Sequence, residues 1–236
     1  MGRNRDFYIV HQDKDIFVVD KPAGLLSVPI PNSNAKNLFD LVADHLGKHG
    51  VRVGSVHRID RYTSGLMVFS KKERAHYDLF EQFKNHTPER CYLAIVRGII
   101  EEDEGELVHY LKLIKEGFRN IVVDKEEEGA TFARLRYKVK ERFANNTLVE
   151  VYLDTGLKNQ IRVQFNEIGH QLVGDQHYAP EEKQEPLINR QALHAYRLSF
   201  KHPRTGKKVT YEAKIPPDML RVMDRFRWNR EKQQNS

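Results

Sequence analysis

Short apolar runs broken by turn-forming residues dominate the first third of the chain. Residues 15–20 (DIFVVD) read as a buried strand that ends at residues 21–24 (KPAG), because proline cannot donate to a ladder and glycine frees the backbone. Residues 29–34 are rich in proline, asparagine and serine and read as a loop. Residues 66–69 (LMVF) predict a second short strand.

Two helices are predicted around this second strand. Four apolar residues between Asn37 and Gly47 fall at i, i+3, i+4 and i+8, which places them on one helix face. They are Leu38, Leu41, Val42 and Leu46. After the strand, Ser70 and Glu73 have the spacing of a capping box that opens a helix ending before Pro88. We expect this helix to bury Leu79, Phe80 and Phe83.

The middle of the chain has the pattern of strands joined by short connections, which implies antiparallel pairing. Four such runs cover residues 92–96, 107–113, 133–140 and 148–153. Further on, Ile161, Phe165 and Ile168 predict a helix that ends at Gly169. Residues 193–200 and 207–213 read as a hairpin around the turn at 202–206.

Pro216 and Pro217 are expected to open a last helix. In it, Leu220, Met223 and Phe226 would pack, whereas four arginines would stay in water. The arginines are Arg221, Arg225, Arg227 and Arg230. The complete pattern predicts the α+β class, with a mixed, largely antiparallel sheet and flanking helices.

Composition limits the kind of protein that this fold can be. The 236 residues are 39% hydrophobic and 31% charged, which suits one packed domain with a core at about 8–215 and a basic helix and tail at 216–236. No apolar run approaches the roughly 18 residues of a membrane span, and residues 1–6 lack the apolar stretch of a signal peptide. The single cysteine, Cys91, suits a reducing compartment. We therefore expect a cytoplasmic protein that has no contact with a membrane.

Charge is unevenly distributed. The net charge is +6, but residues 101–128 hold ten acids against four bases, so the remainder carries +12. A basic body suggests a polyanionic partner, most often nucleic acid, while a plain solvated basic surface stays an alternative.

The densest polar cluster is HRIDRYTSG at residues 57–65, directly before a predicted strand. Asp60 lies between Arg58 and Arg61, whose charges would keep it ionised, as a nucleophile or general base requires. The two arginines would also suit phosphate contacts. The alternative from composition alone is a surface salt-bridge cluster beside a turn.

Several other chemistries lack their motifs. The chain contains no serine-hydrolase elbow, no phosphate-binding glycine loop and no zinc-protease helix. Its eleven histidines are scattered, and neither His170 with His177 nor His194 with His202 has a recognised ligand spacing. We expect no metal site.

Residues 57–71 resemble the H-R-L-D-R-x-T-S-G-L signature of the RluA family of RNA pseudouridine synthases. Further segments that match this family follow in the family's order. They are residues 20–25, 92–98, 156–163, 169–175, 193–195 and 202–206. Together the segments span most of the chain.

The resemblance implies a single catalytic domain with a central RNA-binding cleft, working as an isomerase without cofactor or metal. Such an enzyme breaks the glycosidic bond of a uridine in RNA and rejoins the base through carbon 5. Asp60 matches the catalytic aspartate, Tyr92 the active-site tyrosine, and Arg162 the arginine that pairs with the aspartate. The aspartate would act as a nucleophile or a proton acceptor.

The resemblance also implies contacts with RNA. The enzyme must bind an unpaired nucleotide or extrude it from the stack, and Arg58 would fill the vacated space. The other expected RNA-binding residues are Arg61, Lys21, Thr63 and Gln160. The basic C-terminal helix would add attraction for the backbone. We expect a monomer acting on rRNA or tRNA.

The chain departs from the family at the third motif, where Leu157, Asn159 and Gln164 replace an arginine and two histidines. These changes affect expected RNA contacts, not the catalytic residues. They also motivate the alternative of a catalytically silent RNA-binding protein on the same fold. A metal-free hydrolase using Asp60 would need a second carboxylate that the motif does not supply.

Overall fold

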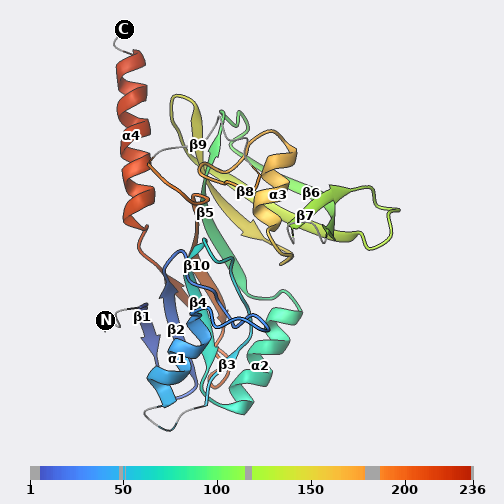
Figure 1. The fold of residues 1–236 in the computed structure, drawn as a ribbon, viewed down its shortest axis with the longest axis vertical. Helices are drawn as coiled ribbons and strands as arrows, with labels where there is room; N and C mark the ends of the chain where they lie inside the picture. Colours follow the sequence, from blue (N-terminus) through green and yellow to red (C-terminus); the bar gives the residue numbers. More distant parts are fainter. Residues whose placement is uncertain (1–5, 48–49, 51, 115–118, 179–186, 235–236) are drawn as a thin grey trace. The chain divides into compact units, whose positions relative to one another are not determined.

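The two apolar runs near the N-terminus form neighbouring strands, β2 (Ile16–Lys21) and β4 (Ser64–Ser70), paired antiparallel with Val19 opposite Met67. They belong to a computed structural model that describes residues 6–47, 50, 52–114, 119–178 and 187–234. The chain divides into two compact units (Figure 1). Unit 1 comprises residues 1–90 and 195–214, and unit 2 comprises residues 91–194 and 215–236.

Unit 1 is a sheet with the strand order β1-β2-β4-β10, in which β3 also pairs with β4 and β11 with β10. The remaining strands are β1 (Tyr8–Gln12), β3 (Gly54–Ser55), β10 (Leu193–Lys201) and β11 (Lys208–Glu212). The two helices are α1 (Leu38–Gly47) and α2 (Glu73–Lys84). The predicted strands, the hairpin and both helices of this unit are confirmed, whereas β1 and β3 were not predicted.

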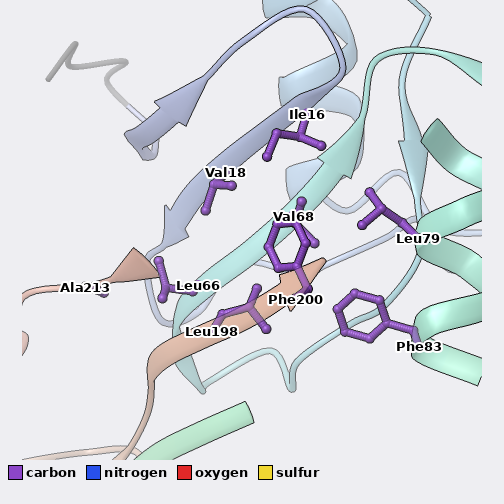
Figure 2. Close-up of a cluster of buried hydrophobic side chains, with 9 residues drawn as sticks. All are labelled: Ile16, Val18, Leu66, Val68, Leu79, Phe83, Leu198, Phe200 and Ala213. Atoms are coloured by element: carbon purple, nitrogen blue, oxygen red, sulfur yellow. The ribbon is translucent and has the colours of Figure 1, made fainter. Parts of the chain in front are cut away.

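Both faces of the β2–β4 pair are covered, which explains why the two strands are apolar at nearly every position. On one face, side chains of β2, β4 and β10 meet those of α2 in one cluster (Figure 2). The cluster consists of Ile16, Val18, Leu66, Val68, Leu79, Phe83, Leu198, Phe200 and Ala213. On the other face, Phe17 stacks on His45 of α1 at 5.7 Å between ring centroids.

The start of α1 agrees with its sequence signal. Asn37 Oδ1 accepts a hydrogen bond of 2.9 Å from the Asp40 backbone N–H, as an N-cap side chain does. Leu38, Val42 and Leu46 are buried.

The start of α2 was predicted wrongly. Its N-cap is Lys72, which makes no capping hydrogen bond with its side chain, and Ser70 belongs to β4. The Ser70 hydroxyl donates instead to the Gly54 carbonyl, at 3.3 Å. The predicted burial of Phe80 was also wrong, because this residue is 46% exposed. The spacing of Ser70 and Glu73 is therefore that of a capping box, but the serine is the last residue of a strand.

Unit 2 is an antiparallel sheet with the order β5-β9-β8-β6-β7. The strands are β5 (Glu89–Arg97), β6 (Glu104–Ile114), β7 (Arg119–Val123), β8 (Thr131–Arg142) and β9 (Asn146–Leu153). Four of them confirm predictions, while β7 was not predicted. Helix α3 (Gln160–Glu167) packs Val163 against Leu111 and Ala133 of this sheet. The α+β class is confirmed.

Helix α4 (Pro217–Gln234) begins at its second proline, as expected, and packs on unit 2. Its buried residues are Met219, Val222, Met223 and Phe226. Leu220, which we expected to pack, is 40% exposed. Arg227 and Arg230, expected in water, are half-buried and bind Glu141 at 2.7 and 3.6 Å. Among the described residues, no helix is long and apolar enough to cross a membrane.

Cross-strand ion pairs offset part of the acidic stretch. Arg134 of β8 binds Glu106 of β6 at 2.5 Å, and Lys138 binds Glu104 at 2.9 Å. Such exposed pairs each contribute about 0.2–1 kcal/mol, so they add little to the stability of the sheet.

Gly65 allows β4 and β10 to approach closely. Its φ is +119°, and a Cβ there would collide with the Ala195 backbone. Gly24 has a similar φ of +88°, but no atom lies within 4 Å of the place that a Cβ would take. A substitution at Gly24 therefore introduces backbone strain alone, whereas one at Gly65 adds a collision with β10.

We predict that Gly24→Ala costs about 1–2 kcal/mol of unfolding free energy, the strain of a left-handed residue. Gly65→Ala should cost at least about 2 kcal/mol more, because β10 must move. Urea unfolding of both variants measures the difference. Equal losses would show that the approach of β10 is not constrained.

Candidate active site

Asp60 begins a tight turn in the loop between β3 and β4. The Thr63 backbone N–H donates to the Asp60 carbonyl at 3.1 Å, which closes a four-residue turn. Aspartate is favoured at the first position of such turns. Asp60 is half-buried, whereas Thr63 is only 1% exposed and lies inside the loop. An RNA contact by the Thr63 side chain does not fit this burial.

Ser27 holds the residue before Asp60 from both sides. Its buried hydroxyl donates to the Ile59 carbonyl at 2.6 Å and accepts from the Ile59 N–H at 3.1 Å. A serine hydroxyl can do both at once. The backbone leading into Asp60 is thereby fixed to the segment between β2 and α1.

Lys21 holds the residue after Asp60. Its ammonium group donates to the carbonyls of Pro22, Leu25 and Arg61 at 3.0, 2.8 and 3.0 Å. These bonds match the three N–H groups of an ammonium, and the residue is 0% exposed. The RNA contact expected of Lys21 does not fit this placement, because the group is buried inside the loop.

Arg58 and Arg61 lie on the outside of the same loop. Both are exposed, and Arg61 Nε donates to the Gly24 carbonyl at 2.9 Å. The Arg61 guanidinium lies 5.4 Å from the ring centroid of Tyr62. Both arginines are therefore accessible to solvent, and their contact with RNA stays a prediction.

His57 links the start of the Asp60 loop to β4 and α2. Its Nε2 accepts a hydrogen bond of 3.0 Å from the Val68 backbone N–H, and its ring stacks on Phe83 with centroids 4.3 Å apart. Burial, aided by the charge of Arg90, lowers the pKa of His57 to about 3. The histidine is therefore neutral at physiological pH and acts as an acceptor. Its position in the motif was visible, but its structural role was not.

Tyr92 and Arg162 belong to unit 2. Tyr92 lies on β5 opposite Val151 and is 8% exposed. Arg162 lies on α3 and makes a bidentate pair with Asp175, with Nε–Oδ2 and Nη2–Oδ1 distances of 2.6 and 2.8 Å. Its guanidinium also lies 5.1 Å from the ring centroid of Tyr178.

Asp175 is a residue that motif reasoning did not assign. Beyond its pair with Arg162, its Oδ1 accepts from the backbone N–H groups of His177 and Tyr178 at 3.0 and 3.3 Å. The carboxylate is 1% exposed, and among the described residues these donors balance its charge. The signal was present, since Asp175 closes the family-like segment at 169–175.

Gln160 has a structural role. Its side-chain carbonyl accepts from the Thr155 hydroxyl and the Leu157 N–H at 2.9 and 3.0 Å, and its amide donates to the Arg134 carbonyl at 3.0 Å. At 2% exposed, it fixes the turn before α3. The expected RNA contact by Gln160 does not fit this burial.

A second polar cluster gathers Asp13, Asp15 and His202, with possible ligand atoms within 4.8 Å of one another. His202 Nε2 lies 2.8 Å from Asp13, while Arg204 and Lys72 bind Asp15. These cations supply the positive charge that a metal would otherwise provide. We interpret the cluster as a link between the β1–β2 and β10–β11 turns.

The model of the family described as RNA pseudouridylate synthase matches residues 15–167, more than half of the chain and including Asp60. The chain belongs to this family. The resemblance to the RluA family is also confirmed, since curated relatives carry the names of its members.

The pseudouridine synthase relatives are similar over most of the chain. The protein named uncharacterized RNA pseudouridine synthase YlyB of Bacillus subtilis is 38% identical over 95% of this chain and 74% of its own. Ribosomal large subunit pseudouridine synthase D of Neisseria meningitidis serogroup A is 35% identical, over 93% of this chain and 61% of its own. The solved structure of human RNA Pseudouridylate Synthase Domain Containing 4 is 21% identical, covers 93% of each chain with a TM-score of 0.77, and supports the fold alone.

The residues expected to catalyse pseudouridine formation are thus distributed over both units. Asp60 is in unit 1, with Ser27, Lys21 and His57 holding its loop, and Tyr92 and Arg162 are in unit 2. Their meeting at one catalytic centre stays a prediction from the family resemblance.

We predict that Lys21→Met lowers the free energy of unfolding by about 2–4 kcal/mol, because the carbonyls of Pro22, Leu25 and Arg61 lose the donor that links them. Urea unfolding checks this. Arg58→Met is the matched control, since removing an exposed cation should change stability by less than about 0.5 kcal/mol. A Lys21→Met protein of parental stability but weakened RNA binding would instead place Lys21 at the RNA surface.

The carboxyl of Asp20 predicts how the free energy of unfolding depends on pH. Burial raises the pKa of Asp20 to about 6, against the opposing effects of the Lys21 charge and the Gly65 N–H. A raised carboxyl pKa stabilises the folded protein fully below the unfolded pKa of 3.8, and this contribution is lost as pH rises through about 6.

Asp20→Asn has no such loss, so its stability relative to the parent should rise between pH 4 and pH 7. The expected rise is about 1–3 kcal/mol, given that one pKa unit corresponds to about 1.4 kcal/mol. Urea unfolding of both proteins at several pH values measures it. A pH-independent difference would contradict a raised pKa of Asp20.

Proposed function

We propose that this protein converts uridine to pseudouridine in ribosomal RNA, with Asp60 as the catalytic aspartate. The observation that carries the proposal is the held turn of Asp60, within a segment that the pseudouridylate synthase model matches. Relatives named for the large ribosomal subunit favour rRNA as the substrate. A tRNA substrate is the alternative within the same chemistry.

The chemistry that we propose uses the residue types present. A half-buried carboxylate held by its backbone can attack an electron-poor sugar carbon or accept a proton, and either role divides the base exchange into easier steps. Preorganisation of this kind lowers the cost of reaching the reactive geometry. The clamps of Ser27 and Lys21 on both neighbours of Asp60 support this role.

Arg162 is proposed to orient Asp60. Its bidentate pair with Asp175 uses two of the five N–H groups of a guanidinium and fixes the plane of the group. A guanidinium held in a fixed plane is suited to orient a carboxylate. Tyr92 is proposed to stack on the uracil that leaves the sugar, as an aromatic side chain can do with an unpaired base.

The protein is proposed to act as a monomer in the cytoplasm. Cys91 is the single cysteine of the sequence, which suits a reducing compartment. The exposed Arg58 and Arg61 are its proposed RNA contacts near the target nucleotide. The silent RNA-binding alternative has less support, since the similar relatives are named as synthases.

We predict that Asp60→Asn lowers pseudouridine formation by at least about 10³-fold while RNA affinity changes little, because the amide keeps the shape but neither attacks nor accepts a proton. Release of tritium from carbon 5 of uracil in labelled rRNA measures the reaction. Asp44→Asn, an exposed aspartate of α1, is the matched control and should keep parental activity. Parental rates for Asp60→Asn would refute the assignment.

A further inference from the structure

Helix α4 carries a basic and aromatic stripe on the face opposite its packed side. Four residues at i, i+4, i+7 and i+11 form this α4 stripe. They are Arg221, Arg225, Trp228 and Lys232, all exposed. The opposite face of the helix packs within unit 2, where Phe226 contacts Phe143 at 5.7 Å between ring centroids.

Trp228 is the unusual member of the stripe. It is the single tryptophan of the chain and is 44% exposed, although indole is the largest apolar side chain. Two cations lie over its ring, with Arg225 Cζ at 4.7 Å and Lys232 Nζ at 4.1 Å from the centroid. An aromatic face beside two long cationic side chains is the combination used to bind unpaired nucleotides.

The other charges of α4 are engaged within unit 2. Arg227 binds Glu141 at 2.7 Å and Asp224 at 3.0 Å, and Arg230 donates to the Arg142 carbonyl at 2.7 Å. These contacts hold the helix against the end of β8 and the turn that follows it. The positive charge of the stripe therefore faces solvent on a fixed support.

We propose that the α4 stripe binds a single-stranded segment of RNA, with one base stacked on Trp228 and neighbouring phosphates bound by Arg221, Arg225 and Lys232. Lys232 would move from the indole to a phosphate as the base arrives. The proposal rests on the proposed function for the nature of the partner. It concerns a contact beyond residues 15–167, the segment that the family model matches.

The stripe fits RNA better than a lipid surface. A helix that lies on a membrane needs a broad apolar face toward the lipid, and the apolar face of α4 is buried against unit 2. The stripe spans about 16 Å along the helix, from the rise of 1.5 Å per residue. This length suits a few consecutive nucleotides.

Because Trp228 is the single tryptophan, its fluorescence reports on the stripe directly. The probe is an oligouridylate of about twelve nucleotides, within the site sizes of single-strand binders. We expect saturable quenching. Three phosphate contacts should weaken the affinity about twentyfold between 50 and 200 mM salt. Binding without quenching, or equal quenching by an RNA duplex or by anionic vesicles, would overturn the proposal.

Variants test the same point in the full chain. Because these variants lack the tryptophan, binding is measured by fluorescence anisotropy of a dye-labelled oligouridylate. Trp228→Ala should weaken this binding about tenfold, the usual effect of one lost stack, and Trp228→Phe should retain most of it. Lys125→Ala, which removes an exposed cation elsewhere on unit 2, is the matched control and should bind within twofold of the parent. Parental affinity of Trp228→Ala would refute the stacking role.

Activity separates this proposal from the proposed function. With long rRNA, Trp228→Ala should raise KM about tenfold and leave kcat unchanged, since the proposed stack contributes equally to substrate and transition-state binding. If the parent quenches with oligouridylate but releases no tritium from rRNA, the proposed function fails and the stripe stands. If the parent releases tritium but is not quenched, the stripe fails and the proposed function stands.

Discussion

The buried ammonium of Lys21 ties together the parts of unit 1 that carry Asp60. It is 0% exposed and donates to three carbonyls, two from the turn after β2 and one from Arg61. The turn after β2 and the turn of Asp60 therefore cannot move independently. Ser27 adds a second link, to Ile59. A loop at the edge of a sheet thereby acquires the rigidity that a positioned carboxylate needs.

In unit 2, a buried ion pair holds the expected catalytic arginine in place. Arg162 and Asp175 are both nearly inaccessible, and breaking such a pair would leave a bare charge in the interior. Two backbone N–H groups also bind the carboxylate, so the pair fixes α3 to the segment at 172–178. Buried charge thus fixes the backbone around Asp60 in unit 1 and the Arg162 side chain in unit 2. That arrangement lets the surrounding surface vary while the reactive groups keep their orientation.

The sequence revealed most of the fold but misplaced several polar side chains. Alternation and helical spacing depend on local periodicity, so β2, β4 and α1 could be predicted from their own residues. The predicted capping role of Ser70 was wrong because strand β4 extends to this residue. The predicted burial of Phe80 was wrong because its side chain on α2 is exposed to solvent. Residue type also suggested that Lys21, Thr63 and Gln160 would contact RNA. Their burial depends on carbonyls and chain segments distant in sequence, which no local pattern reports.

The departures from the family pattern have structural consequences that bear on substrate choice. Gln164 is fully buried and donates to the carbonyls of Leu107 and Ala133, so it cannot reach a substrate. Leu157 packs against the cluster under α3, and Asn159 adopts the left-handed conformation that asparagine tolerates at the start of that helix. The third motif therefore consolidates unit 2 instead of presenting cations to RNA. Helix α4, by contrast, presents exposed cations on a support that ion pairs anchor within unit 2.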